Sequence, residues 1–226
     1  MNTLAHEPPA LSLQSDLFER AAAAARAGRI LLGDPDRLDQ VLVLLTAINL
    51  GSIRRRLSDL DDVPEAQALL QTRPCIDAHS VDYDALRRLP DGTLGREYAR
   101  FLDANGITPE PFERAPALGD PRAAYLVQRL RQTHDLWHVV TGYGPDVRGE
   151  LLLQAFTYAQ VGAPGSAVIA IGGSLRFFHT LDHATELRRA YLRGTEAAAF
   201  ALFAWEAHFD TPVAEVQRKL RCPAAS

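Results

Sequence analysis

The sequence predicts an all-α fold, built as a single domain of about eight to ten helices. Apolar residues recur at helical spacing between proline and glycine breaks, and strict alternation over five or more residues is absent. The β-branched run 168–171 is too short to found a sheet. The chain is 47% hydrophobic, which supports a sizeable core, and no polar linker interrupts it. We expect residues 1–14 to be a flexible N-terminus and residues 15–226 to form the domain.

Capping residues and glycines set the expected boundaries of the first elements. A helix should begin at Ser15 and Asp16 and stop at Gly33. The stretch "DPDRLDQVLVLLTAI" has a proline behind a capping aspartate and predicts a second, buried helix. Residues 51–63 look polar and turn-like, and a short helix is expected over 64–71.

A turn at 90–92 starts the second half of the fold. It leads into a helix over 94–103, which the Asn105-Gly106 pair should end because both residues tolerate positive φ. Five further helices are predicted over residues 121–140, 145–161, 166–180, 185–209 and 212–220.

No charged residue lies between Glu150 and Arg176, a stretch long enough to raise the question of a membrane span. Two glutamines, Pro164 and a glycine pair argue against a span, so we expect two helices instead. They either are simply buried or line a slot for a long apolar ligand.

Composition restricts the class of partner and the compartment. The net charge of −4 gives no basic excess of the kind that nucleic-acid binders show. Cys75 and Cys222 fit neither a disulfide framework nor a CxxC metal site. The N-terminus lacks the pattern of a signal or transit peptide, so we expect a cytosolic protein.

The stretch "THDLWHVVTGYGPDVRGE" gathers four groups that can bind a metal. On a helix of about 100° per residue, His134, His138 and Asp135 point at roughly 0°, 40° and 100°. Histidines at i and i+4 can reach one ion. The "YGPD" turn and an antiparallel return could bring Glu150 back to them. Two nitrogens and two carboxylates suit zinc, iron(II) or manganese, and are less typical of magnesium. One carboxylate could instead accept a hydrogen bond from an imidazole and hold that ring in its tautomer.

Two alternatives use other histidines. His179 and His183 also have i,i+4 spacing, with Asp182 between them, and either face the core or form a second site. An HD-type phosphohydrolase would need His79 and Asp182 within ligand distance of the His134-Asp135 doublet.

The spacing His134-Asp135-x-x-His138, eleven residues and Glu150 resembles the HDxxH-x11-E signature of the Coq4 family of ubiquinone biosynthesis proteins. "LPDGTLGREYARFLDANGI", "GELLLQAFTYAQVGAP" and "AYLRGTEAAAFALFAWEAHFDTPVAEVQRKL" resemble further blocks of that family. The resemblance covers nearly the whole chain from about residue 15, and all four signature positions are intact.

The resemblance implies a helical fold and a divalent metal, zinc above all, held by His134, Asp135, His138 and Glu150. Iron, manganese and magnesium are the other candidates. It implies a metal-dependent decarboxylase that removes the C1 carboxylate of a polyprenylated 4-hydroxybenzoate derivative, with or without O2-dependent hydroxylation, and Glu150 and Asp135 as catalytic groups. It also implies other quinone biosynthesis enzymes as partners, a homodimer, and transient contact of a cytoplasmic bacterial protein with the inner membrane.

A competing hypothesis is a non-catalytic lipid-binding scaffold whose metal is structural. A closed set of four ligands favours a structural metal, whereas an open coordination position favours catalysis.

Overall fold

The computed structural model describes residues 11–34, 37–108, 118–178 and 180–225. Within these ranges the regular structure is helical and no strand is formed, which confirms the predicted fold class. The α-helices are α1 (Leu17–Gly33), α2 (Leu38–Leu60), α3 (Pro64–Thr72), α4 (Tyr83–Arg88), α5 (Leu94–Asn105), α6 (Pro121–Thr141), α7 (Val147–Val161), α8 (Pro164–Phe177), α9 (Leu181–Glu196) and α10 (Val213–Lys219).

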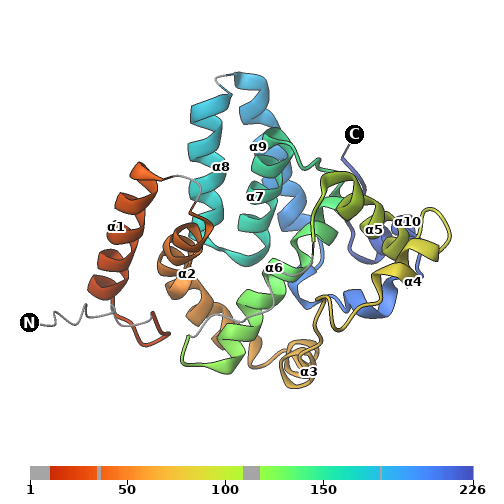
Figure 1. The fold of residues 1–226 in the computed structure, drawn as a ribbon, viewed down its shortest axis with the longest axis horizontal. Coiled ribbons are helices and arrows are strands. Elements are labelled where there is room, and N and C mark those ends of the chain that lie inside the picture. The colour runs from red at the N-terminus through yellow and green to blue at the C-terminus, as the bar shows by residue number, and fades with distance from the viewer. Residues whose placement is uncertain (1–10, 35–36, 109–117, 179, 226) are drawn as a thin grey trace, which may run out of the picture.

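Helix α6 lies at the centre of the fold (Figure 1). It contacts α5 and α10 on one side and α2 and α3 on the other, while α7 packs against α8 and α9. The main core is built around Trp137, Phe156, Phe200 and Trp205, each no more than 2% exposed. The central helix is therefore held from several directions, which fixes the side chains near its C-terminus.

Residues 51–63 were expected to be turn-like, and this prediction is wrong. Helix α2 continues unbroken to Leu60. Leu50, Ile53, Leu57 and Leu60 are all buried and keep the helical spacing through the polar stretch. Arginines fill positions between these apolar residues. The stretch is therefore polar in composition although it forms an amphipathic helix.

The predicted helix over 185–209 is wrong in its second half. Helix α9 ends at Glu196, and two 3₁₀ turns follow at Phe200–Leu202 and Trp205–His208. These turns bury Phe200 and Trp205 completely, and the Trp205 indole donates to the Phe200 carbonyl. Tertiary burial of two large rings thus overrides good helix propensity.

Smaller differences concern α4, α7 and α8. Helix α4 has six residues and was not predicted, whereas α7 begins two residues later and α8 two residues earlier than expected. No helix in the described ranges has the length and apolar character needed to cross a membrane.

The described part of the N-terminus is packed. Leu13 is buried against α2 and α6, and its N–H donates to the Leu118 carbonyl.

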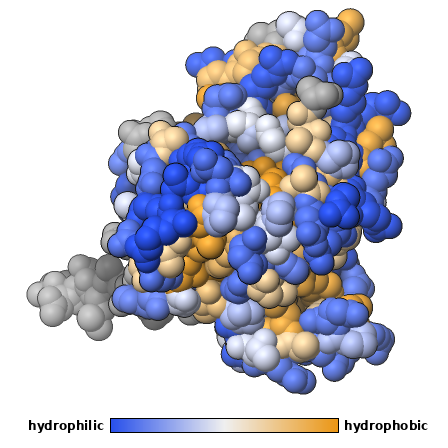
Figure 2. Space-filling view, turned by 90° about the vertical axis from the view of Figure 1, so that its right-hand side faces the viewer, coloured by the Kyte–Doolittle hydropathy of each residue, from blue (hydrophilic) through white to orange (hydrophobic). Residues whose placement is uncertain are grey.

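On the side of the molecule that carries α4 and α5, the surface is mostly hydrophilic with small apolar patches (Figure 2).

Candidate metal centre

The last turns of α6 carry both histidines. Asp120 caps the helix, accepting from two backbone N–H groups, and Pro121 stands at its first position, as is typical of helix starts. The helix ends at Gly142, whose φ of 77° is left-handed and whose N–H donates to the His138 carbonyl. The chain therefore reverses directly after the histidines.

A close backbone contact brings Glu150 back to them. Asp146 caps α7, and a Cβ added to Gly149 would lie 2.0 Å from the Gly144 carbonyl oxygen. Only glycine allows this approach, because backbone on both sides cannot give way. Glu150 follows at once and projects from the first turn of α7 towards α6.

His134, His138 and Glu150 form a compact group of ligand atoms, all within 4.8 Å of one another. Glu150 Oε1 lies 3.1 Å from His138 Nε2, and Glu150 Oε2 lies 3.5 Å from His134 Nε2. The His138 side chain is 1% exposed, whereas those of His134 and Glu150 are 30% and 40% exposed. The group is thus anchored in the core on one side and open to solvent on the other.

The hydrogen bonds of His138 indicate which of its ring nitrogens carries a proton and which can bind a cation. Its Nδ1 is 3.0 Å from the Tyr143 carbonyl oxygen, which can only accept, so Nδ1 carries a proton. In the neutral ring Nε2 then presents a lone pair to the Glu150 carboxylate. Two lone pairs facing each other require a proton or a cation between them. A ring whose other nitrogen donates to a carbonyl is also the arrangement that metal-binding histidines adopt.

The ionisation of the group follows from the same contacts. Burial opposes the charge on Glu150, but His134 and His138 outweigh it and lower the pKa of that carboxyl to about 2. Burial alone would lower the pKa of His134, but the Glu150 carboxylate raises it overall. The donor set of two imidazoles and one carboxylate therefore fits a divalent cation, with His134, His138 and Glu150 able to hold it.

Asp135, the fourth predicted ligand, does not join the three-residue group. It lines a neighbouring cavity with Tyr98 and Arg131. Burial raises the pKa of the Asp135 carboxyl, although the two histidines partly oppose this and Glu150 adds only a smaller upward contribution. Asp135 therefore lies next to the group and outside it, and its role as a fourth ligand stays a prediction.

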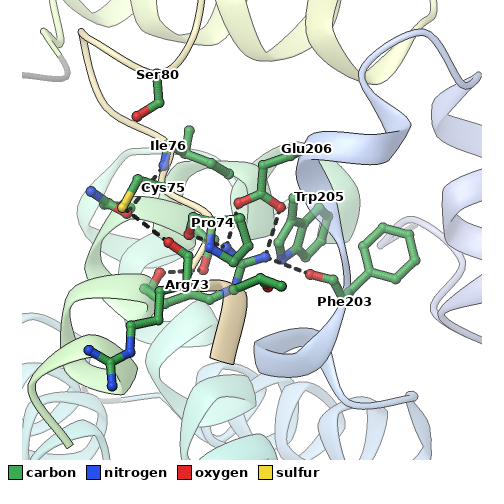
Figure 3. A network of polar contacts seen from close by, with 12 residues as sticks. Arg73, Pro74, Cys75, Ile76, Ser80, Phe203, Trp205 and Glu206 are labelled. Atoms are coloured by element: carbon green, nitrogen blue, oxygen red, sulfur yellow. Dashed lines mark hydrogen bonds and ion pairs between the residues drawn. The ribbon is translucent and has the colours of Figure 1, made fainter. Parts of the chain in front are cut away.

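A buried ion pair holds α6 in place. Arg129 lies five residues before His134 and nine before His138 on the same helix, and it is 0% exposed. Its guanidinium pairs with Glu206 at 2.5 and 3.0 Å and donates to the Phe203 carbonyl at 2.8 Å. It also donates to the carbonyl of Pro74. Figure 3 shows that Pro74, Phe203 and Glu206 lie close together. Arg129 and Glu206 are 77 positions apart, so no local pattern in the sequence points to this pair.

The other histidines are placed as follows. His183 is 3% exposed, and its Nε2 lies 2.9 Å from Ser174 Oγ, so it faces the core between α8 and α9. Its predicted neighbour His179 lies outside the described residues. Within the described chain, His79 and Asp182 do not group with His134 in a set of metal-ligand atoms, so the phosphohydrolase arrangement is not formed.

The uncharged run 151–175 divides between core and surface. Leu153 and Phe156 of α7 are fully buried, whereas Val168, Ile171 and Leu175 of α8 are 57–69% exposed along one face. Neither the cavity beside Asp135 nor a shallow groove between α4 and residues 206–210 is lined by this run.

Comparison with protein families gives a match over residues 11–225 to the family described as coenzyme Q (ubiquinone) biosynthesis protein Coq4. The ubiquinone biosynthesis protein COQ4 homolog, mitochondrial, of Xenopus tropicalis is 35% identical over 164 residues, which are 73% of this chain and 59% of that protein. The protein of the same name from Homo sapiens is 34% identical over 173 residues, covering 76% of this chain and 63% of the human protein. The match thus spans less than two thirds of either relative.

A solved structure shares the fold. The crystal structure of a protein from Nostoc punctiforme PCC 73102, described as a candidate ubiquinone biosynthesis protein, superposes with a TM-score of 0.72 at 27% sequence identity. The superposition covers 88% of this chain and 97% of the Nostoc chain.

Proposed function

Since the chain belongs to the Coq4 family of coenzyme Q (ubiquinone) biosynthesis proteins, we propose that it is a metal-dependent decarboxylase of that biosynthesis. The substrate is a polyprenylated 4-hydroxybenzoate derivative, which loses its ring carboxylate at C1. The observation that carries the proposal is the three-residue group of His134, His138 and Glu150, open to solvent on one side.

The number and exposure of the ligands favour catalysis over a structural metal. A structural zinc site uses four protein ligands, whereas a catalytic site keeps one position for water or substrate. Two of the three side chains here are 30% and 40% exposed, so an incoming ligand can reach them. The scaffold hypothesis gains no such support from this arrangement.

The reaction requires a place for the electrons of the departing carboxylate. In the non-oxidative route C1 of the ring takes up a proton, the para hydroxyl supports the resulting cation, and the C1–carboxylate bond then breaks to release CO2. A divalent cation, when bound, supplies a positive charge that orients and polarises an oxygen of the substrate. We propose that Asp135 exchanges the proton, a role supported by its position lining a cavity beside the group. Glu150 and the histidines fix the reacting end.

The lipid nature of the substrate calls for a membrane surface. Helix α8 presents Val168, Ile171 and Leu175 to solvent, with Phe177 57% exposed at its end. We assign this apolar face to transient contact with the inner membrane of a bacterium, where a prenyl tail resides and gains about 0.8 kcal/mol per buried CH2. Other quinone biosynthesis proteins and a second copy of the chain are the further partners proposed. Flotation with lipid vesicles tests the membrane contact, and light scattering tests the dimer.

Turnover of a prenylated 4-hydroxybenzoate with a ¹³C-labelled carboxylate tests the activity. The metal content of the protein is measured first, and the reaction is run with and without O2. We expect labelled CO2 in proportion to bound metal, with hydrogen at C1 without O2 and a hydroxyl there only if the oxidative route operates. Metal-loaded protein that releases no labelled CO2 in either atmosphere would overturn the proposal.

A further inference from the structure

A small cavity lies beside the metal-binding group, between α5 and α6. Tyr98 and Leu102 line it from α5, and Arg131, Gln132 and Asp135 line it from α6. Its volume is about 10 Å³, room for about one water molecule or the end of a small polar group. Asp135 directly follows His134, and Phe101, the neighbour of Leu102, stacks on the His138 ring at 5.3 Å. The cavity and the metal-binding group are therefore formed by neighbouring residues of α5 and α6.

A buried hydrogen-bond donor at this cavity has no acceptor. Gln132 is 5% exposed, and its Oε1 accepts from the backbone N–H of Ile76 at 3.2 Å. That bond fixes the amide orientation and leaves Nε2 as a donor without a partner among the described residues. A buried amide donor without an acceptor costs about 1–3 kcal/mol. An acceptor supplied by a ligand would remove this cost.

The cation at the cavity likewise has no partner in the part of the chain that the structure describes. Arg131 is partly buried, yet no ion pair or hydrogen bond joins its guanidinium to the described parts of the chain, and burial lowers its pKa. Arg129, two residues earlier, has a carboxylate and two backbone carbonyls as partners. Asp135 lines the same cavity but does not pair with Arg131. The fold thus keeps a desolvated positive charge next to an unsatisfied donor, a combination that is costly unless an anion binds there.

We propose that Arg131 and Gln132 form an anion subsite that receives the carboxylate of an aromatic acid beside the metal-binding group. A planar guanidinium pairs with both oxygens of a carboxylate, and the amide of Gln132 supplies a further donor. The cavity admits the carboxylate end only, so the ring lies outside it, towards His134 and Glu150. Naming the ligand an aromatic carboxylate rests on the proposed function, whereas the anion subsite rests on the side chains alone.

Binding of 4-hydroxybenzoate, with neutral 4-hydroxybenzamide as the matched probe, tests the subsite by ligand-observed NMR on the purified protein. We expect Arg131→Gln to weaken 4-hydroxybenzoate binding about tenfold or more, while 4-hydroxybenzamide binding is unchanged. Arg131→Lys should recover part of the loss because it keeps the charge. Arg189→Gln, on the exposed face of α9, is the control and should bind like wild type. No preference for the acid over the amide in wild type, or equal binding by Arg131→Gln, would overturn the subsite.

Gln132→Glu gives a second, independent variant. It keeps an oxygen for the Ile76 N–H but replaces the free donor with an anion, so the acid should no longer bind. Thermal melting checks whether a loss of binding comes from misfolding. Arg131→Gln removes a charge that has no partner among the described residues, so this variant should melt no lower than wild type. An arginine with a structural role would lower the melting temperature instead, and that result would overturn the assignment.

The two proposals fail differently. If Arg131-dependent binding is found but no CO2 is released, the subsite stands and the decarboxylase does not. If Arg131→Gln releases CO2 with an unchanged KM, the decarboxylase stands and the subsite is wrong.

Discussion

His138 and Glu150 face each other across 3.1 Å between Nε2 and Oε1, while the other nitrogen of the same ring faces the Tyr143 carbonyl oxygen. The ring is held in one tautomer by the backbone, and its free lone pair points at a carboxylate. The sequence separates the two residues by a helix end, a turn and a helix start.

The first prediction concerns the metal itself. We expect about one divalent ion per chain in the purified protein, and His134→Ala should lose most of it because one of three ligands is removed. Elemental analysis measures the content. His208→Ala removes an imidazole outside the ligand group and should keep the ion. Full retention by His134→Ala would contradict the ligand assignment.

Metal binding should strengthen as the pH rises from 6 to 8. Glu150 raises the pKa of His134 above its ordinary 6.5, so the metal-free protein holds that proton more tightly than a free imidazole does. At pH values below the pKa of His134 in the unfolded chain, this raised pKa stabilises the metal-free fold. The contribution is lost as the pH rises through the pKa of His134 in the folded protein. Proton competition with the metal falls over the same range. The difference in melting temperature between zinc-loaded and metal-free protein should therefore widen with pH. An equal difference at both pH values would count against this coupling.

The close approach of Gly149 to Gly144 predicts a sharp effect of one methyl group. A Cβ at position 149 would lie 2.0 Å from a backbone oxygen, so Gly149→Ala must shift the start of α7 and move Glu150. We expect a loss of about 1–3 kcal/mol in unfolding free energy together with weakened metal binding. Gly172→Ala is the matched control, since no atom lies within 4 Å of its added Cβ. It should be neutral, or stabilising by up to about 1 kcal/mol. Equal behaviour of the two variants in urea unfolding would refute the packing argument.

The buried pair of Arg129 and Glu206 should matter far more than exposed pairs. Arg129→Gln leaves a carboxylate whose side chain is only 23% exposed without its cation, and we expect a loss of about 3 kcal/mol. Arg87→Gln breaks contacts of an exposed arginine with Asp84 and Asp103 and should cost far less, because exposed ion pairs are screened by solvent. Chemical denaturation of both variants measures the difference. A similar small loss in both would show that the buried pair does not anchor α6.

Local periodicity explains which parts of this arrangement are visible in the sequence. His134 and His138 share a helix face because 3.6 residues make a turn, and the caps Asp120 and Asp146 mark the helix starts. The return of Glu150 also follows from local signals, since a short turn separates the two helices. Arg131 lies one turn before Asp135 on the same face, so the same periodicity could have identified it.

Tertiary contacts explain what the sequence conceals. The continuation of α2 to Leu60 depends on a core formed with α6, and the early end of α9 depends on burying Trp205. The pair of Arg129 and Glu206 joins residues 77 positions apart. Neither the early end of α9 nor this pair has a signal within one window of the chain, because each depends on which elements meet in space. The continuation of α2 does have a local signal, the helical spacing of its buried apolar residues from Leu50 to Leu60.

The last prediction separates an enzyme from a scaffold. Glu150→Gln is nearly isosteric, but it removes the charge that the two imidazoles face, and we expect activity to fall by at least about a hundredfold while the fold persists. Glu215→Gln removes a carboxylate of α10 whose side chain is 42% exposed and lies outside the ligand group, and it is the control. In cells that lack the native protein, Glu150→Gln should fail to restore quinone and should accumulate a precursor that still carries its ring carboxylate. Circular dichroism and thermal melting come first, since a structural metal predicts misfolding of this variant instead. A folded Glu150→Gln protein that restores normal quinone levels would favour the scaffold, because a scaffold needs the shape of α7 and not the charge at its first turn.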